Sequence, residues 1–420
     1  MPETIVEKQI AIVLGGTNPH KELIANLKKR GYYTVLIDYY KNPPARETAD
    51  EHIQESTLDQ EKVLEIARRR NASLVISACV DQANVVACYV AEKLSLPRPY
   101  SYETAKSIAN KVSMKKQMAE HKILTAPFCV ARNGQLPAKN ELPEFPLIVK
   151  PADSNGSKGV KRVNYYRDLK KALKEAYSFS RVGKVIIEKY ITGANIDAVC
   201  LAQNGRADIV MLRKRFGVID KDSGGLQYFQ SIIPANISVS LKKDIQTIAQ
   251  KITDVFRLKN TPIQLQVIAD KNDKIYVIEF APRVGGGLSY KTVNMIYGFN
   301  ILDAAIESYF DRPDKFSLGK NEYLYSENNI YSSPCVFKSL TGLKEMKKDG
   351  LIEAGYVYKT LGMEVGGTMA SKDRVGSFIV KGKTIDELKG KVKKVVEGIE
   401  VYNDKKAPVM KKELFNKLYV

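Results

Sequence analysis

A lysine followed at once by a glycine-rich polar loop is the first part of this sequence that could do chemistry. Lys150 stands near the end of the apolar run Leu147–Pro151, and a loop over residues 153–160 follows with two glycines. Glycine lets backbone N–H groups approach an anion closely, and a lysine adds fixed positive charge. The combination predicts a phosphate-binding loop, although an ordinary hairpin turn would explain the loop on its own.

A second segment joins an apolar strand to a pair of charged residues. The run over residues 185–187 leads directly into Glu188 and Lys189. Such a strand end can present backbone and side-chain groups to the edge of an adenine ring. A strand that simply reaches solvent is the plainer explanation, and the sequence leaves both open.

Amide and carboxylate side chains alternate along two later strands. Gln264 and Gln266 lie on the first strand and Glu279 on the second, and a turn over residues 270–274 joins the strands. Because side chains on a strand point to alternate faces, these three can share one face of the sheet. Oxygen ligands that converge from two strands suit a hard cation such as Mg²⁺, which also bridges to nucleotide phosphates.

The elements that position these residues begin with an alternation of strands and helices. Strand-like runs at Ile10–Leu14, Tyr33–Ile37 and residues 73–77 alternate with helical periodicity at 20–30, 61–70 and 84–94. This βαβαβ order predicts a doubly wound parallel sheet. The Gly-Gly turn after the first strand does not form the full G-x-G-x-x-G fingerprint, so we predict no NAD site there. A tight structural turn explains it at least as well as phosphate binding does.

The rest of the chain has a different pattern. We predict one helix over residues 104–121, a strand-rich region over 123–310 that carries the motifs, and a long amphipathic helix over 385–399. Hairpin turns are predicted at Asn133-Gly134 and Asn204-Gly205. We therefore expect parts bounded at residues 1–103, 104–190, 191–320 and 321–420.

Composition excludes several classes of protein. The 420 residues are 44% hydrophobic and 27% charged, and no apolar run approaches the roughly 20 residues that cross a bilayer. The five cysteines form no CxxC pair and the three histidines are far apart, so we expect buried reduced thiols, a cytoplasmic location and no zinc site. The net charge of +19 is spread along the chain. This favours solvated helix faces over a nucleic-acid or membrane surface, with a basic groove for a polyanionic substrate as the alternative.

Taken in this order and at these separations, the motifs resemble the ATP-grasp superfamily. That superfamily includes D-alanine–D-alanine ligase, biotin carboxylase, the carbamoyl phosphate synthetase large subunit and the L-amino acid ligases. The run over residues 283–289, with three consecutive glycines, and the segment over 373–376 are most similar to the amino acid ligase branch. The resemblance covers essentially the whole chain. It implies an α/β fold, with an N-terminal Rossmann-like parallel sheet domain followed by a two-lobed α+β ATP-grasp domain.

The resemblance also implies roles for individual residues. The residues expected to bind ATP are Lys111, Lys150, Ser154, Gly156, Ser157, Gly159, Glu188, Lys189, Ile191 and Asn195. Gln266 and Glu279 are the expected ligands of Mg²⁺, with Mn²⁺ as an alternative ion. Lys150 and Arg283 are the expected catalytic residues, and the organic substrates are expected beside Arg283, Gly285, Gly286 and Gly287.

Two positions depart from the family pattern. Asn195 stands where relatives often carry a ribose-binding glutamate, and Ala281 stands where most relatives place an asparagine ligand to the metal. An amide still accepts a hydrogen bond from a ribose hydroxyl, whereas an alanine side chain offers no ligand. The number of metal ions, one or two, is therefore open.

The activity that the resemblance implies is ligation of a carboxylate to an amine through an acyl-phosphate, with release of ADP and phosphate. The expected partners are small-molecule substrates, amino acids among them, and a homodimer is expected from the resemblance alone. Arg283 would bind the acyl-phosphate, unless it forms a structural salt bridge. The basic residues Arg213, Lys214 and Arg215 would favour an acidic or phosphorylated substrate. Two alternatives stay open, namely bicarbonate chemistry within the same superfamily and nucleotide binding without turnover.

Overall fold

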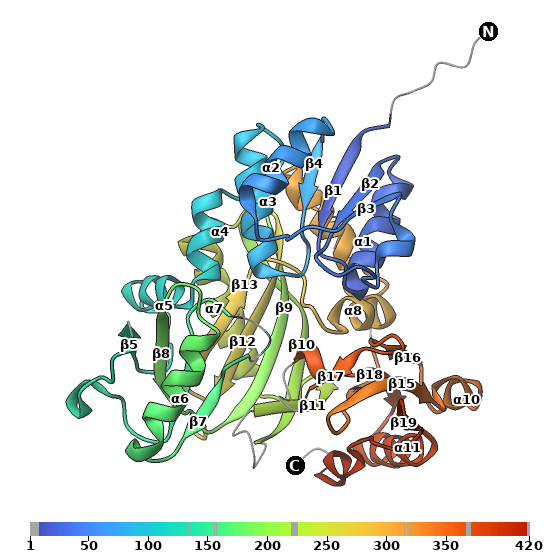
Figure 1. Ribbon diagram of the computed structural model, residues 1–420. Helices are drawn as coiled ribbons and strands as arrows, with labels where there is room; N and C mark the ends of the chain where they lie inside the picture. Colours follow the sequence, from blue (N-terminus) through green and yellow to red (C-terminus); the bar gives the residue numbers. More distant parts are fainter. Residues whose placement is uncertain are drawn as a thin grey trace.

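The computed structural model of the protein describes residues 8–132, 134–154, 156, 158–219, 226–314, 316–319, 321–366 and 371–417. Strands within these ranges form four sheets. Figure 1 shows the N-terminal sheet in blue at the top, a smaller sheet in green at the lower left and a large central sheet that continues into the orange and red C-terminal part. The residues of the candidate site come from the N-terminal sheet, the smaller sheet, the large sheet and the C-terminal part.

The N-terminal sheet is parallel throughout, with the strand order β3-β2-β1-β4. Its strands are β1 (Ile10–Leu14), β2 (Tyr33–Ile37), β3 (Glu51–Ile53) and β4 (Leu74–Ile76), and its helices are α1 (Asn18–Lys29), α2 (Gln60–Arg69) and α3 (Asp81–Lys93). The predicted doubly wound parallel sheet is therefore confirmed. β3 was not predicted, because it has only three residues and none of them is fully buried.

The predicted helix over residues 104–121 is wrong as a single element. The chain forms α4 (Tyr102–Ala109) and α5 (Lys111–Glu120), which are separated by Asn110 in an extended conformation. The Asn110 side chain accepts hydrogen bonds from the backbone N–H groups of Val112 and Ser113. These N–H groups would otherwise lack a partner at the start of the new helix. The break places Lys111 at the first position of α5.

The smaller sheet carries the lysine and the glycine-rich loop. It is antiparallel with the order β5-β8-β6-β7, formed by β5 (Phe128–Arg132), β6 (Leu147–Pro151), β7 (Lys161–Val163) and β8 (Lys184–Lys189). Helix α6 (Tyr166–Ser178) buries Leu169, Leu173 and Ala176 against this sheet. The predicted strand at Leu147–Pro151 is confirmed to the residue.

The large sheet has eight antiparallel strands in the order β13-β12-β9-β10-β11-β14-β18-β16. These are β9 (Ala194–Gln203), β10 (Arg206–Ile219), β11 (Leu226–Ile233), β12 (Thr261–Ala269), β13 (Ile275–Ala281), β14 (Leu324–Ile330), β16 (Ala354–Val357) and β18 (Gly376–Gly382). Helix α7 (Val239–Val255) covers part of one face. Strands β14, β16 and β18 follow residue 320, so the C-terminal part is hydrogen-bonded into the same sheet as the central part.

A three-stranded sheet completes the C-terminal part. It consists of β15 (Cys335–Thr341), β17 (Glu364–Val365) and β19 (Glu400–Asn403), and α10 (Leu343–Lys348) and α11 (Ile385–Gly398) accompany it. The long amphipathic helix predicted over residues 385–399 is confirmed as α11, which ends one residue earlier. The predicted Asn204-Gly205 hairpin turn between β9 and β10 is also present, whereas Asn133 lies outside the described residues.

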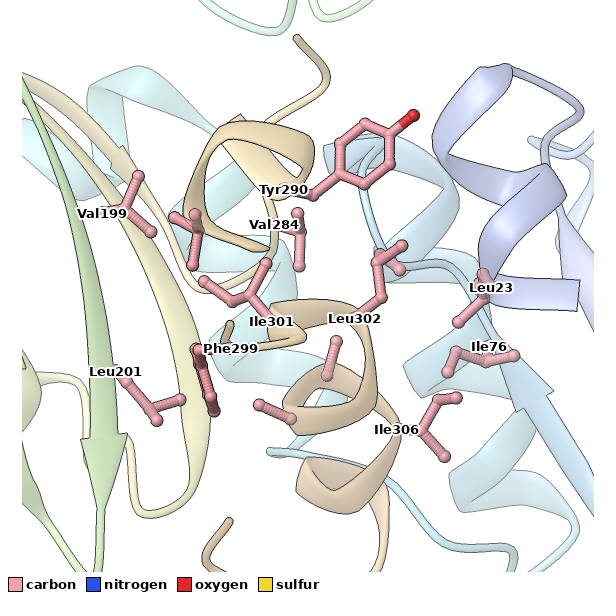
Figure 2. Close-up of a cluster of buried hydrophobic side chains, with 14 of the residues drawn as sticks. Leu23, Ile76, Val199, Leu201, Val284, Tyr290, Phe299, Ile301, Leu302 and Ile306 are labelled. Atoms are coloured by element: carbon pink, nitrogen blue, oxygen red, sulfur yellow. The ribbon is translucent and has the colours of Figure 1, made fainter. Parts of the chain in front are cut away.

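Two helices connect the N-terminal sheet to the large sheet. Helices α8 (Ser289–Tyr297) and α9 (Ile301–Tyr309) lie between them in Figure 2, with Val199 and Leu201 of β9 on one side and Leu23 and Ile76 on the other. Burial of each such aliphatic side chain contributes about 1.5–3 kcal/mol. The packing therefore fixes the loop that precedes α8, which contains the three consecutive glycines.

In the described part of the chain, no helix has both the length and the apolar character that a transmembrane span requires.

Candidate nucleotide and substrate site

Lys111 connects the glycine-rich loop to the strand that carries Glu279. Its Nζ donates a hydrogen bond to the backbone oxygen of Ser154 at 2.6 Å and lies 3.5 Å from Glu279 Oε2. Gly156 and Gly159 have φ angles of +64° and +69°, a region that strongly favours glycine. Ser157, which was predicted to bind ATP, lies outside the described residues.

A buried triad of charges lies behind this loop. Glu188 accepts from Lys150 at 2.6 Å and forms an ion pair with Lys115 at 2.9 Å. Lys115 is fully buried, donates to the Thr125 hydroxyl, and has its Nζ 5.3 Å from the centre of the Phe128 ring. Glu188 holds both lysines in place, because its loss would leave two buried positive charges unpaired.

The triad also sets the charge of Glu188. Burial by itself raises the pKa of this carboxyl group, but the charges of Lys115 and Lys150 outweigh burial and bring the pKa to about 2. Glu188 is therefore ionised at neutral pH, and its carboxylate is already engaged by two lysines. Lys115 was missed by the sequence reasoning. The only available signal was its place four residues after Lys111, on the same side of one helix.

The remaining predicted ATP-binding residues line one cavity. Tyr228 donates its hydroxyl to Asn195 Oδ1 at 2.8 Å, and the Arg215 guanidinium lies 3.4 Å from the centre of the Tyr228 ring. The cavity is lined, among others, by Lys111, Lys150, Ser154, Gly156, Glu188, Lys189, Ile191, Asn195, Gln266 and Glu279. The structure thus brings together residues that are far apart in the sequence. Gly159 is not among the lining residues.

The two predicted metal ligands are direct neighbours on adjacent strands. Gln266 on β12 pairs with Glu279 on β13, and Gln264 also lines a small cavity with both of them. The predicted common face is therefore confirmed. One carboxylate with one amide oxygen fits Mg²⁺, which usually takes few protein ligands and completes its shell with water and substrate phosphates. Ala281 is buried and adds no ligand, and no group of three or more acidic, histidine or cysteine side chains with metal-binding geometry occurs within the described ranges.

Arg283 is held by a carboxylate from the N-terminal part of the chain. Its Nε and Nη2 donate to the two carboxylate oxygens of Asp81, both at 2.8 Å, and its Nη1 donates to the Val284 backbone oxygen. Burial raises the pKa of Asp81, but the charge of Arg283 outweighs it and lowers the pKa. These bonds use three of the five guanidinium N–H groups, so the salt bridge orients Arg283 beside the small cavity and leaves donors for a substrate.

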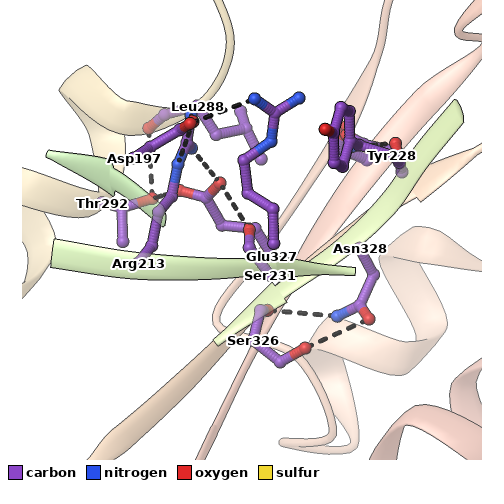
Figure 3. A network of polar contacts seen from close by, with 12 residues as sticks. Asp197, Arg213, Tyr228, Ser231, Leu288, Thr292, Ser326, Glu327 and Asn328 are labelled. Atoms are coloured by element: carbon purple, nitrogen blue, oxygen red, sulfur yellow. Dashed lines mark hydrogen bonds and ion pairs between the residues drawn. The ribbon is translucent and has the colours of Figure 1, made fainter. Parts of the chain in front are cut away.

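A second network surrounds Arg213, as Figure 3 shows. Arg213 donates to Asp197 at 2.7 Å and to Glu327 at 2.6 Å, and Arg215 also donates to Asp197. Glu327 in turn accepts from the Thr292 hydroxyl on α8. Two carboxylates therefore already balance the charge of Arg213, which corrects the prediction that Arg213 faces an acidic substrate. Arg215, in contrast, lines the cavity that contains the predicted ATP-binding residues.

A much larger cavity has a volume of about 1100 Å³. Gly286 and Gly287 line it, together with Thr17, Asp38, Tyr39, Tyr40, Lys158, Tyr290, Tyr356, Tyr358, Lys359, Met363, Glu364 and Arg374, among others. Gly16 donates its N–H to Asp38, and a Cβ on Gly15 would lie 2.8 Å from the His20 ring. The Gly-Gly turn is therefore explained by close packing at the edge of this cavity.

His20 and Cys79 are in contact beside this turn, which the sequence did not indicate. Cys79 Sγ lies 3.5 Å from His20 Nε2, and Thr17 contacts both side chains. Burial raises the pKa of the Cys79 thiol to about 11 and lowers the pKa of His20 to about 4. Both groups are therefore neutral at pH 7, and the pair lacks the thiolate that a nucleophilic cysteine needs.

Comparison with known proteins gives a matching family model and several relatives. Residues 143–291 match the family model of the ATP-grasp domain. The chain is similar to D-alanine–D-alanine ligase of Thermosipho africanus, with 31% identity over 43% of this chain and 52% of that protein. It is also similar to a formate-dependent phosphoribosylglycinamide formyltransferase of Methanocaldococcus jannaschii, with 27% identity over 65% of this chain and 69% of that protein.

A solved structure extends the likeness to nearly the whole chain. The L-amino acid ligase from Bacillus licheniformis superposes with a TM-score of 0.77 over 95% of this chain and all of that one, at 16% identity. At this identity the likeness establishes the fold. In sequence, the chain spans about half the length of the Thermosipho africanus ligase that it matches.

Proposed function

We propose that this chain, whose residues 143–291 match the ATP-grasp domain, is an ATP-dependent ligase that joins a carboxylate to an amine through an acyl-phosphate. One observation carries most of this proposal. Lys111 contacts both the backbone of the glycine-rich loop and the carboxylate of Glu279. The phosphate end and the metal end of the site are therefore adjacent, as transfer of a terminal phosphoryl group requires.

The side chains of this site are arranged to stabilise charge in place. Lys111 and Lys150 would bind the nucleotide phosphates, and the Glu188 triad holds Lys150 in a fixed position. Adenine would lie against the backbone of residues 189–191, because the Glu188 carboxylate is engaged by lysines. Asn195 would accept a hydrogen bond from a ribose hydroxyl. Such preorganised charges lower the barrier without any reorganisation during the reaction.

Gln266 and Glu279 would hold Mg²⁺, or Mn²⁺ in its place, and the ion would neutralise charge on the transferring phosphoryl group. The substrate carboxylate attacks the terminal phosphorus of ATP, and ADP leaves. Arg283, oriented by Asp81, would then bind the oxygens of the acyl-phosphate. An amine displaces phosphate from the acyl carbon, which gives the amide.

The organic substrates would occupy the cavity of about 1100 Å³ beside Gly286 and Gly287. This volume exceeds what bicarbonate needs and suits reactants of amino-acid size or larger. Tyrosine side chains from three separate segments line it, which supports organic substrates with apolar surface. The relatives are named for reactions of different small molecules. The proposal therefore assigns only the chemical class of the two substrates, a carboxylate and an amine.

Phosphate release from Mg·ATP tests the proposal directly. We would measure it with amino acids and small acids, singly and in pairs, for the native protein and for Glu279→Ala. The proposal predicts release that requires an acid and an amine together and that is lost in the variant. Release that requires bicarbonate in place of an organic acid would favour bicarbonate chemistry, and nucleotide binding without release for any pair would indicate a binding protein.

A further inference from the structure

Two buried side chains near the three consecutive glycines at residues 285–287 have no hydrogen-bond partner among the described residues. Gln264 is 5% exposed, and neither its Oε1 nor its Nε2 is paired with any described residue. Ser289, the first residue of α8, is 1% exposed, and its Oγ is likewise unpaired within the described chain. Buried polar groups in folded proteins are almost always hydrogen-bonded, because an unpaired one loses its contacts with water without replacement. These groups therefore point to a ligand.

The backbone of Gly285 packs directly against both side chains. A Cβ on Gly285 would lie 2.7 Å from Gln264 Oε1 and 2.7 Å from Ser289 Oγ. No other side chain could occupy this position without moving one of them. Two unpaired oxygen atoms therefore converge on the same side of Gly285, where only glycine fits.

The Gln264 side chain and Gly285 lie between the two parts of the proposed active site. Gln264 lines the small cavity that also contains Gln266, Glu279 and Arg283. The next residue of the loop, Gly286, lines the large cavity. A group held beside Gly285 would thus be close to the transferring phosphoryl group on one side and to the organic substrates on the other.

We propose that Gln264 and Ser289 bind the attacking amino group of the second substrate beside Gly285. This inference rests on the proposed ligase function and adds the residues that hold the amine. Two converging oxygen atoms accept hydrogen bonds from the N–H groups of an amine and direct its lone pair away from them. The Gln264 Nε2 group remains free to donate to the acyl oxygen, so one carboxamide would hold both reacting groups side by side.

In the step itself, the amine nitrogen forms a bond to the acyl carbon. The bond between that carbon and the phosphate oxygen breaks, and phosphate leaves with the electron pair and accepts the proton of the amine. No oxidant, reductant or further reactant is needed. Gln264 and Ser289 take no proton, and their role is to fix the direction of attack.

The stability of two matched variants tests whether Gln264 is a ligand-binding group. Gln264→Met removes a buried amide that has no partner, whereas Gln230→Met removes one that is equally buried and donates to Asn328 at 2.8 Å. Without ligand, Gln264→Met is expected to leave the thermal midpoint unchanged or raise it, and Gln230→Met is expected to lower it. A drop in both variants would overturn the inference, because Gln264 would then have a structural role.

Hydroxylamine serves as the probe amine for the kinetic test. It converts an acyl-phosphate to a hydroxamate, which iron(III) detects by colour, with the amino acids and small acids of the panel as acids. Gln264→Met and Ser289→Ala are each expected to raise the hydroxylamine KM about tenfold, which is the effect of about one lost hydrogen bond. Gln230→Met is expected to keep the hydroxylamine KM of the native protein.

The outcomes separate the inference from the proposed function. Hydroxamate formation by the native protein with an unchanged hydroxylamine KM in both site variants would overturn the inference and leave the ligase function standing. Absence of both hydroxamate and phosphate release in the native protein, with every acid of the panel, would overturn the ligase function and this inference with it.

Discussion

The two ends of the candidate site are built in different ways. One end is the cavity proposed to bind the nucleotide, called the nucleotide end. There the charged side chains neutralise one another within the protein, as in the pairs of Glu188 with Lys115 and Lys150. At the substrate end, glycine loops and tyrosine side chains from distant segments enclose a cavity of about 1100 Å³. The nucleotide end is therefore preorganised for one kind of charge, whereas the substrate end offers shape and a few polar contacts.

This difference indicates which parts of the site are tied to the common chemistry. Phosphoryl transfer needs fixed charges at fixed distances, and a buried triad supplies them independently of the substrate. The segments that enclose the large cavity do not need to hold charges at fixed distances. We expect substitutions at the nucleotide end to affect turnover and stability, and substitutions at the substrate end to affect recognition of the acid and the amine.

The largest effect is expected at Glu279. Glu279→Gln keeps the size of the side chain but removes the carboxylate that would hold the metal, so kcat for phosphate release should fall about 10³-fold. Asp208→Asn is the matched control, since each native side chain is 37% exposed and each lies near a basic side chain. Equal activity of the two variants would contradict the assignment of Glu279 to the metal.

Stability against pH tests the substrate end, where His20 is buried below the Gly-Gly turn. Its pKa is lowered from 6.5 to about 4 by burial, so the unfolded chain binds a proton between these values and the folded chain does not. Stability should therefore decrease as the pH falls from 6.5 to 4, by about 3 kcal/mol in total. In urea unfolding, His20→Gln should lose less stability between pH 6.5 and pH 4 than the native protein loses. The exposed His121, changed to Gln, is the control that should keep the full loss.

A smaller change is expected when the buried triad loses one lysine. Lys115→Met leaves Glu188 with Lys150 alone in a buried environment, which should lower the free energy of unfolding by about 2 kcal/mol. Urea unfolding measures this quantity. Lys62→Met removes the exposed pair with Glu65 and should leave the unfolding midpoint unchanged. Similar results for the two variants would show that the triad does not hold the nucleotide end in place.

The smallest effect is expected at Arg374 in the large cavity. Its Nη1 lies 3.8 Å from the position of a Cβ on Gly287, and its Nε is buried. Arg374→Lys keeps the charge but loses the planar fork, so the KM of the organic substrates should rise about tenfold. Steady-state kinetics should show an unchanged KM for ATP. A parallel rise in the KM for ATP would remove the distinction between the two ends.

Much of the nucleotide end could be predicted because its residues occur in continuous motifs. The strand Leu147–Pro151 and the common face of Gln264, Gln266 and Glu279 follow from local alternation, and both are confirmed. The break at Asn110 was missed because the Asn side chain replaces helix hydrogen bonds with its own. The spacing of apolar residues, from which the helix was predicted, does not reveal this replacement.

The substrate end could not be predicted for a physical reason. Asp81 binds Arg283 across 202 positions of sequence, and His20 contacts Cys79 across 59. Such pairs are produced by the packing of segments that are far apart in the sequence, and neither residue type nor spacing indicates them. The unpaired state of Gln264 is likewise visible only when all its neighbours are known.

Transfer of a labelled oxygen tests the acyl-phosphate mechanism most directly. The acid is supplied with ¹⁸O in both carboxylate oxygens, together with ATP, Mg²⁺ and the amine, and the released phosphate is examined by mass spectrometry. The mechanism predicts one ¹⁸O atom in each phosphate, because the carboxylate oxygen that attacks phosphorus leaves with it. Phosphate without ¹⁸O would mean that water, and not the carboxylate, attacks ATP, and would contradict ligation through an acyl-phosphate.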